Sequence, residues 1–104
     1  MGLSDTRNQI SSRDDFYDLL AWIKASERRV DILTCLDDGP KNSTDFATQW
    51  DVTPEAVSYH LKQLKQGGPD GEYPALIHVV TPDRERYRLW GPTDHGRDLV
   101  EYLQ

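Results

Sequence analysis

The sequence predicts a mainly helical α+β domain with the element order α-α-α-α-β-β-α, and three observations indicate this fold class. Between residues 13 and 66, apolar side chains recur at helical spacing in four segments that turn or capping residues separate. Residues 75–81 and 85–90 are rich in β-branched and aromatic residues and flank a Pro-Asp turn, which predicts a hairpin. A last amphipathic segment, capped by Thr93 or Asp94, predicts a closing helix.

Two helices are expected before residue 40. The first covers residues 13–24 and can be capped by Ser11 or Ser12, and the second covers residues 27–38 after Ser26. Gly-Pro at residues 39–40 should end the second helix. Residues 1–11 are polar, so we expect a loose N-terminal segment and a single domain over residues 12–104.

Residues 43–66 have the pattern of a helix, a tight turn and a second helix. Ser43 is a candidate cap for the first helix, and Asp51 tolerates the left-handed conformation that a sharp corner needs. Thr53 can cap the second helix, and Pro54 suits its first position. The second helix is therefore expected over residues 54–66.

The second helix of this pair has two different faces. Val57, Leu61 and Leu64 recur at helical spacing and form a face for burial. The opposite face carries hydrogen-bonding side chains, namely Glu55, Ser58, Tyr59 and Lys62. Such side chains on a rigid helix suit the reading of base edges in the DNA major groove, although a merely solvated face is the alternative.

Length and composition restrict the function classes. The chain has 104 residues, which suffices for one modest core. There is no apolar run long enough to span a membrane and no signal-peptide pattern, so we expect a cytoplasmic protein without a membrane partner. No nucleophile triad, phosphate-binding glycine loop or metal-ligand spacing is present, so we expect neither an enzyme nor a cofactor. The single cysteine, Cys35, is expected to be a small buried side chain.

The charge distribution is uneven. The net charge is −6, which is unusual for a DNA-binding domain. However, residues 53–66 and 84–88 together carry five basic and two acidic side chains, a net +3, so the remainder carries −9. The chain also has 13 Asp against 5 Glu and only 4 Lys. That composition resembles proteins of organisms with a salt-rich cytoplasm, such as haloarchaeal proteins, although an ordinary acidic protein is the alternative.

Three arginines, Arg84, Arg86 and Arg88, lie two residues apart in and just before the second predicted strand. Alternate residues of a strand point to the same side, so these guanidinium groups should lie together. Such a set suits a phosphate clamp or a minor-groove probe. Pairing with surface Asp residues is the alternative.

At this point the chain resembles the winged helix-turn-helix regulators of the ArsR type. Residues 29–40 resemble the family pattern R-x-x-I-L-x-x-L-x-x-G-P, and residues 53–64 resemble its recognition helix, S-x-x-x-V-S-x-H-L-x-x-L. Tyr-Arg-Leu at residues 87–89, before residues 96–99, resembles the final wing strand and closing helix. Trp50 stands where Leu is usual in the family, and Asp51 stands where Gly is usual.

The resemblance implies a regulator that binds double-stranded DNA. The recognition helix over residues 54–66 would enter the major groove, and the wing over residues 75–90 would lie on the backbone or in the minor groove. The DNA-contacting residues would be Thr53, Glu55, Ser58, Tyr59, Lys62, Arg84, Arg86 and Arg88. The family's Cys-x-Cys metal pair is missing, because Cys35 is alone, so metal sensing is not carried over.

The resemblance also implies a homodimer through the terminal helices. The candidate interface residues are Phe16, Leu19, Leu20, Trp22, Ile23, Leu99, Val100, Tyr102 and Leu103. Packing of these helices within one chain is the alternative. Two functions thus remain open. The first is a dimeric, sequence-specific DNA-binding regulator that acts as a repressor, and the second is a winged-helix module that binds another protein and not DNA. The effector, if one exists, is unknown from the sequence.

Overall fold

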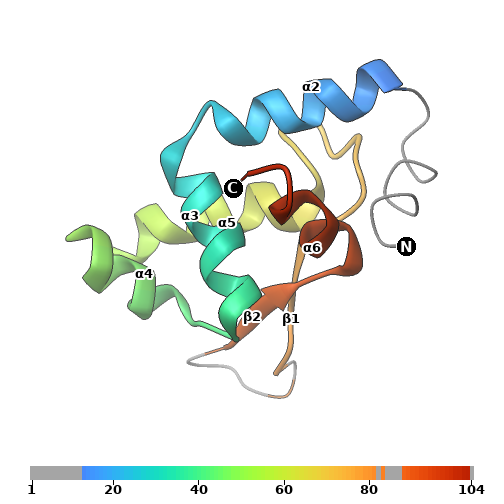
Figure 1. Cartoon of the computed structure of the whole chain (residues 1–104). Helices are drawn as coiled ribbons and strands as arrows, with labels where there is room; N and C mark the ends of the chain where they lie inside the picture. Colours follow the sequence, from blue (N-terminus) through green and yellow to red (C-terminus); the bar gives the residue numbers. More distant parts are fainter. Residues whose placement is uncertain (1–12, 82, 84–87, 104) are drawn as a thin grey trace.

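The computed structural model describes residues 13–81, 83 and 88–103, and within them it has the predicted mainly helical architecture. The helices are α2 (Arg13–Lys24), α3 (Glu27–Asp38), α4 (Ser43–Trp50), α5 (Pro54–Gln66) and α6 (Asp94–Val100). The strands are β1 (Ile77–Val79) and β2 (Trp90–Pro92). Figure 1 shows α2 at one end of the molecule and the strands at the other. The loose segment expected over residues 1–11 lies outside the described residues.

Helix α4 begins one residue earlier than its predicted cap implies. The sequence predicted Ser43 as the cap, whereas Asn42 holds that position and Ser43 is the first helical residue. The Asn42 side chain accepts a hydrogen bond from the Asp45 backbone N–H, and the Asp45 carboxylate accepts one from the Asn42 N–H, both at 2.9 Å. This reciprocal pair satisfies two N–H groups that a helix start leaves free, so it determines which residue becomes the cap.

The turn and the start of α5 follow the sequence prediction. Asp51 is left-handed, with φ 56° and ψ 50°, and it ends α4. The Thr53 hydroxyl then accepts a hydrogen bond from the Ala56 N–H, and Pro54 occupies the first turn of α5. Gly67, also left-handed, ends the helix. The helix-turn-helix therefore has fixed ends on both of its helices.

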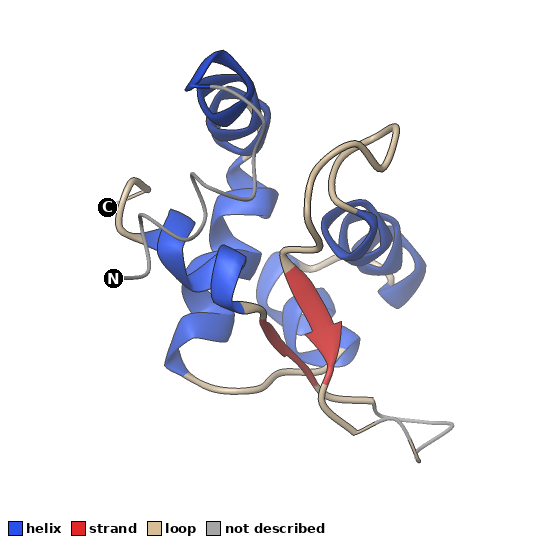
Figure 2. Ribbon diagram, turned by 90° about the vertical axis from the view of Figure 1, so that its right-hand side faces the viewer, coloured by secondary structure: helices blue, strands red, loops and turns tan. Residues whose placement is uncertain are grey.

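Within the described residues, the regular strands of the hairpin differ from the predicted ones. The first strand was expected over residues 75–81 and covers only Ile77–Val79, and the second was expected over residues 85–90 but is Trp90–Pro92. The strands are antiparallel, with Val79 opposite Trp90 (Figure 2). Trp90 pairs on its other side with Lys41, through backbone hydrogen bonds of 2.7 and 3.1 Å. Trp90 is thus held from both sides.

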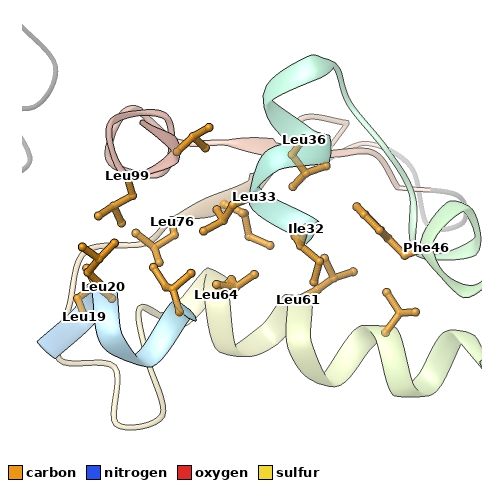
Figure 3. Close-up of a cluster of buried hydrophobic side chains, with 14 of the residues drawn as sticks. Leu19, Leu20, Ile32, Leu33, Leu36, Phe46, Leu61, Leu64, Leu76 and Leu99 are labelled. Atoms are coloured by element: carbon orange, nitrogen blue, oxygen red, sulfur yellow. The ribbon is translucent and has the colours of Figure 1, made fainter. Parts of the chain in front are cut away.

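One hydrophobic core joins the helices to the base of the hairpin. Figure 3 shows side chains of α2, α3, α4, α5 and α6 pointing toward one another, with Leu76 among them. Phe46, Leu61, Leu64 and Leu76 are each 1% exposed or less. This burial fixes α5 against the rest of the domain. Within the described part of the chain, no helix combines the length and the apolar character that crossing a membrane requires.

Candidate nucleic-acid interface

Helix α5 buries one face and exposes another, as its sequence predicted. Val57, Leu61 and Leu64 are buried in the core. On the outer side, Glu55 and Lys62 are exposed, and Tyr59 is 60% exposed. A large aromatic side chain of this exposure in the middle of a helix contributes little to the core. The outer face of α5 is therefore free to contact a partner.

Thr53 stands at the N-terminal end of this face. Its hydroxyl accepts a 3.3 Å hydrogen bond from the Ala56 N–H, and the residue is exposed. The helix dipole places partial positive charge at this end of α5, which favours an anion such as a phosphate. The position thus suits both roles expected of Thr53, the cap and the phosphate contact.

A pocket of about 320 Å³ lies between α5, the start of α4 and the residues that lead into β2. Leu61 lines it, together with six polar or aromatic residues: Ser43, Ser58, Lys62, Lys65, Arg88 and Trp90. Three of these, Ser58, Lys62 and Arg88, were predicted DNA contacts, and the structure brings them together. Glu55 and Tyr59 do not line the pocket. The predicted face thus has two parts: Glu55 and Tyr59 lie outside the pocket, whereas Ser58 and Lys62 line it on the side toward the wing.

Ser43, Lys65 and Trp90 are functional candidates that the sequence reasoning missed. A signal for Lys65 was present, because Ser58, Lys62 and Lys65 are spaced by four and three residues, which places them on one side of a helix. The Lys65 ammonium lies 6.0 Å from the centre of the Trp90 ring. No comparable signal existed for Ser43 or Trp90, which come from other elements.

The wing was expected to carry three aligned arginines on one strand. Arg88 is exposed and lies two residues before β2, so it is not part of the regular strand as predicted. The irregular pairing next to it is held by the Leu89 N–H, which donates to the Thr81 hydroxyl at 2.9 Å. Arg84 and Arg86 lie outside the described residues. Only Arg88 is therefore placed relative to α5.

His60 lies at the edge of the buried face, where its ring packs against Trp50 and Tyr59. Burial lowers the pKa of His60 below its usual range, and the nearby Arg28 and Arg29 charges lower it further. The His60 Nδ1 atom is buried and has no hydrogen-bond partner among the described residues. The ring therefore acts through packing on that side, and its neutral form is favoured.

The candidate dimer residues are divided between the core and the surface. Six of them are at most 9% exposed within a single chain: Phe16, Leu19, Leu20, Ile23, Leu99 and Val100. Trp22, Tyr102 and Leu103 are only partly buried. Phe16 contacts Tyr102 edge to face, with ring centres 5.1 Å apart, so the two terminal segments meet within the chain. A second subunit could reach only the three partly buried residues without unfolding the core.

Metal-binding side chains do not gather in the described part of the chain, where no group of three or more His, Cys, Asp or Glu could hold an ion. Cys35 was expected to be buried and is half-buried. Burial raises the pKa of its thiol, as does the neighbouring Asp31 charge. Since the thiolate is the metal-binding form, this environment disfavours metal binding by Cys35.

Residues 26–68 match the family model described as bacterial regulatory protein, arsR family. The matched range runs from the cap of α3 to the end of α5, so it contains the whole helix-turn-helix and leaves the wing and α2 outside. No curated protein and no solved structure matches the chain. The family match supports an ArsR-like helix-turn-helix and, with it, a DNA-binding transcription regulator.

Proposed function

We propose that this chain is a dimeric, sequence-specific repressor that binds double-stranded DNA with α5 in the major groove. The observation that carries the proposal is the outer face of α5, which lies within the range similar to ArsR-family regulators. An α-helix fits the major groove, where each base pair presents its own pattern of donors and acceptors. The helix is held by its buried face, so its outer side chains can be presented in fixed register.

Each outer residue has a role that its chemistry allows. The Glu55 carboxylate can accept a hydrogen bond from a cytosine amino group, and Lys62 can donate to guanine or to a phosphate. Tyr59 can contact a thymine methyl group or a sugar. The hydroxyls of Thr53 and Ser58 can donate to phosphate oxygens or base edges. Together these residues would provide both sequence reading and orientation on the duplex.

The wing would add contacts beside those of α5. Arg88 lines the same pocket as Lys62, which supports a path for DNA along both elements. From the sequence alone, we include Arg84 and Arg86 as further contacts to the backbone or minor groove. Guanidinium groups suit both sites, because they bind phosphate with two hydrogen bonds and are attracted to the negative minor groove.

A homodimer would explain how such a small domain selects an operator. Trp22, Tyr102 and Leu103 are partly exposed at the terminal segments, and the adjacent Tyr17 is 46% exposed. Two-fold pairing through this surface would place two recognition helices about one DNA turn apart, or roughly 34 Å, on a palindromic site. Repression would follow when that site overlaps a promoter.

The acidic composition suggests that binding takes place at high salt. At about 1 M salt the Debye length is near 3 Å, so long-range attraction to DNA is weak. Affinity would then depend on close hydrogen bonds and shape, which the polar face of α5 can supply. A net charge of −6 also favours the second candidate function, a winged-helix module that binds a protein.

The test is selection of bound fragments from a genomic DNA pool by the full chain, at low and at multimolar potassium chloride, followed by sequencing. The matched control is Tyr59→Ala with Lys62→Gln, which changes only exposed residues of α5. We expect one palindrome to be enriched at both salt concentrations by the wild type and not by the control. Failure of the folded protein to retain any duplex would contradict the proposal and favour the protein-binding module. Sedimentation of the protein–operator complex checks for two chains on each site.

A further inference from the structure

The pocket between α5 and the wing is positively charged within an acidic protein. Three cationic side chains line it, Lys62, Lys65 and Arg88, and its described lining contains no carboxylate, although the chain has 18 acidic residues. Lys62 and Lys65 make no ion pair with any residue in the described ranges. The Lys62 and Lys65 ammonium groups lie on one partly enclosed surface and repel each other. Binding of an anion there would relieve this repulsion.

The walls of the pocket are held in place by the fold. Leu61 is 1% exposed and anchors the α5 side to the core. On the opposite side, Trp90 is bonded through its backbone to Lys41, and it also pairs with Val79. Lys41 comes two residues before Ser43, so the same bridge connects the start of α4 to the wing. The pocket therefore exists before any ligand arrives.

The donors suit a phosphate group. Ammonium and guanidinium groups form strong, charge-assisted hydrogen bonds with phosphate oxygens, and the Ser43 and Ser58 hydroxyls can each donate one more. The pocket continues the side of α5 that turns toward the wing, next to the face assigned to base contacts. A backbone phosphate of a duplex bound by α5 would thus be close to this opening, whereas a free phosphate would have to enter independently.

We propose that this pocket holds one backbone phosphate of the bound duplex, with Lys65 and Ser43 as contacts in addition to Lys62 and Arg88. Trp90 is a positioning residue, because its ring holds the Lys65 ammonium through a cation–π contact at 6.0 Å. This inference rests on the proposed function and deepens it, because it places a phosphate between the recognition helix and the wing.

The first experiment compares Lys65→Gln with Lys24→Gln on one duplex of fixed sequence. Lys24 is exposed at the end of α2 and does not line the pocket, so both variants change the net charge equally. Affinity is measured between roughly 0.1 and 1 M potassium chloride. Lys65→Gln should flatten the slope of log K against log salt by about 0.9, the value for one phosphate contact, and Lys24→Gln should leave it unchanged. Equal slopes for wild type and Lys65→Gln would overturn the proposal.

The second experiment identifies the source of the phosphate. The Trp90 indole N–H signal is assigned with Trp90→Phe and followed by NMR during titration with the duplex and, separately, with inorganic phosphate. The duplex should shift the signal, and millimolar inorganic phosphate should neither shift it nor displace the duplex. Saturable binding of inorganic phosphate that competes with DNA would overturn the DNA-phosphate assignment and identify a small-anion site.

Failure of this inference is distinguishable from failure of the proposed function. If Tyr59→Ala weakens duplex binding while Lys65→Gln has the wild-type affinity and slope, the chain binds DNA through α5 and the pocket holds no phosphate. If the folded wild type binds no duplex, both proposals are wrong. Unfolding midpoints of the Tyr59, Lys65 and Lys24 variants should equal that of the wild type, since these three side chains are exposed. The positioning role of Trp90 is tested with Trp90→Leu in two backgrounds. The substitution should weaken DNA binding of the wild-type protein. It should have no further effect in the Lys65→Gln variant, which has no ammonium group to position.

Discussion

The two sides of α5 have different surroundings although they share one short helix. Val57, Leu61 and Leu64 lie in the core, each 1% exposed or less. On the other side, Glu55, Tyr59 and their neighbours face solvent or the basic pocket. The first set is constrained by packing, whereas we propose that the second set contacts DNA. Substitutions on the buried side should therefore change stability, and substitutions on the outer side should change binding.

The largest expected effect is on the buried side. Leu64→Ala should lower the free energy of unfolding by roughly 2–5 kcal/mol, because it removes apolar contacts and leaves a cavity. Its control, Lys62→Ala, is two residues away and exposed, so it should stay within about 0.5 kcal/mol of the wild type. Urea unfolding followed by circular dichroism measures both. Similar losses from both variants would contradict the separation of the two sides.

A somewhat smaller loss is expected at the C-terminal end of α5. Gly67 has φ +84°, and a Cβ there would overlap the Tyr73 carbonyl, so Gly67→Ala should cost roughly 2–3 kcal/mol from backbone strain and crowding. Gly71 also has a positive φ, but a Cβ there meets only the Gln66 carbonyl oxygen at an ordinary 3.6 Å. Gly71→Ala should therefore cost less, about 1–2 kcal/mol. Thermal unfolding measures both variants. Equal losses in unfolding temperature would contradict the claim that crowding against the Tyr73 carbonyl adds to the cost of Gly67→Ala.

Thr53, the cap at the N-terminal end of α5, is expected to affect both the stability of the domain and its DNA binding. Thr53→Ala removes the acceptor for the Ala56 N–H and should cost about 1 kcal/mol of stability. It should also weaken duplex binding severalfold if the hydroxyl contacts a phosphate. Thr53→Ser keeps the hydroxyl and should restore both properties. A stability loss without any loss of DNA affinity would limit Thr53 to its structural role.

The smallest expected effect concerns pH. The pKa of His60 is lowered in the folded protein, first by burial and then by Arg28 and Arg29, while the unfolded chain keeps the usual value of 6.5. Below pH 6.5 the unfolded state thus takes up a proton that the folded state resists, so the His60 contribution falls as the pH falls. Between about pH 7.5 and 5.5, wild type should lose more stability than His60→Gln. Parallel unfolding midpoints of the two proteins over this range would disprove the effect.

The helices were predictable because their signals are local. Thr53 with Pro54, and Gly39 with Pro40, set helix ends through interactions within a few residues, and α5 spans the predicted range. The predicted cap of α4, Ser43, was wrong by one residue, because Asn42 and Ser43 are both residues that cap helices well. The position of Asp45, three residues after Asn42, selects Asn42.

The wing and the pocket depend on contacts between distant residues, and this is why the sequence predicted them less well. The alternating pattern over residues 85–90 suggested a strand, but among the described residues of this segment regular strand pairing includes only Trp90, which meets both Val79 and Lys41. The same bridge brings Ser43 toward Lys65, so a pocket formed by three elements could not be read from any one of them.

The most direct test of the account is to measure stability and operator affinity together in the Ser58→Ala, Lys62→Ala double variant. Both substitutions lie on the outer side of α5, and alanine preserves the helix. The account predicts a free energy of unfolding within about 1 kcal/mol of the wild type and at least a roughly tenfold loss of affinity for the selected operator. Wild-type affinity in this folded variant would contradict the claim that the outer face of α5 binds DNA.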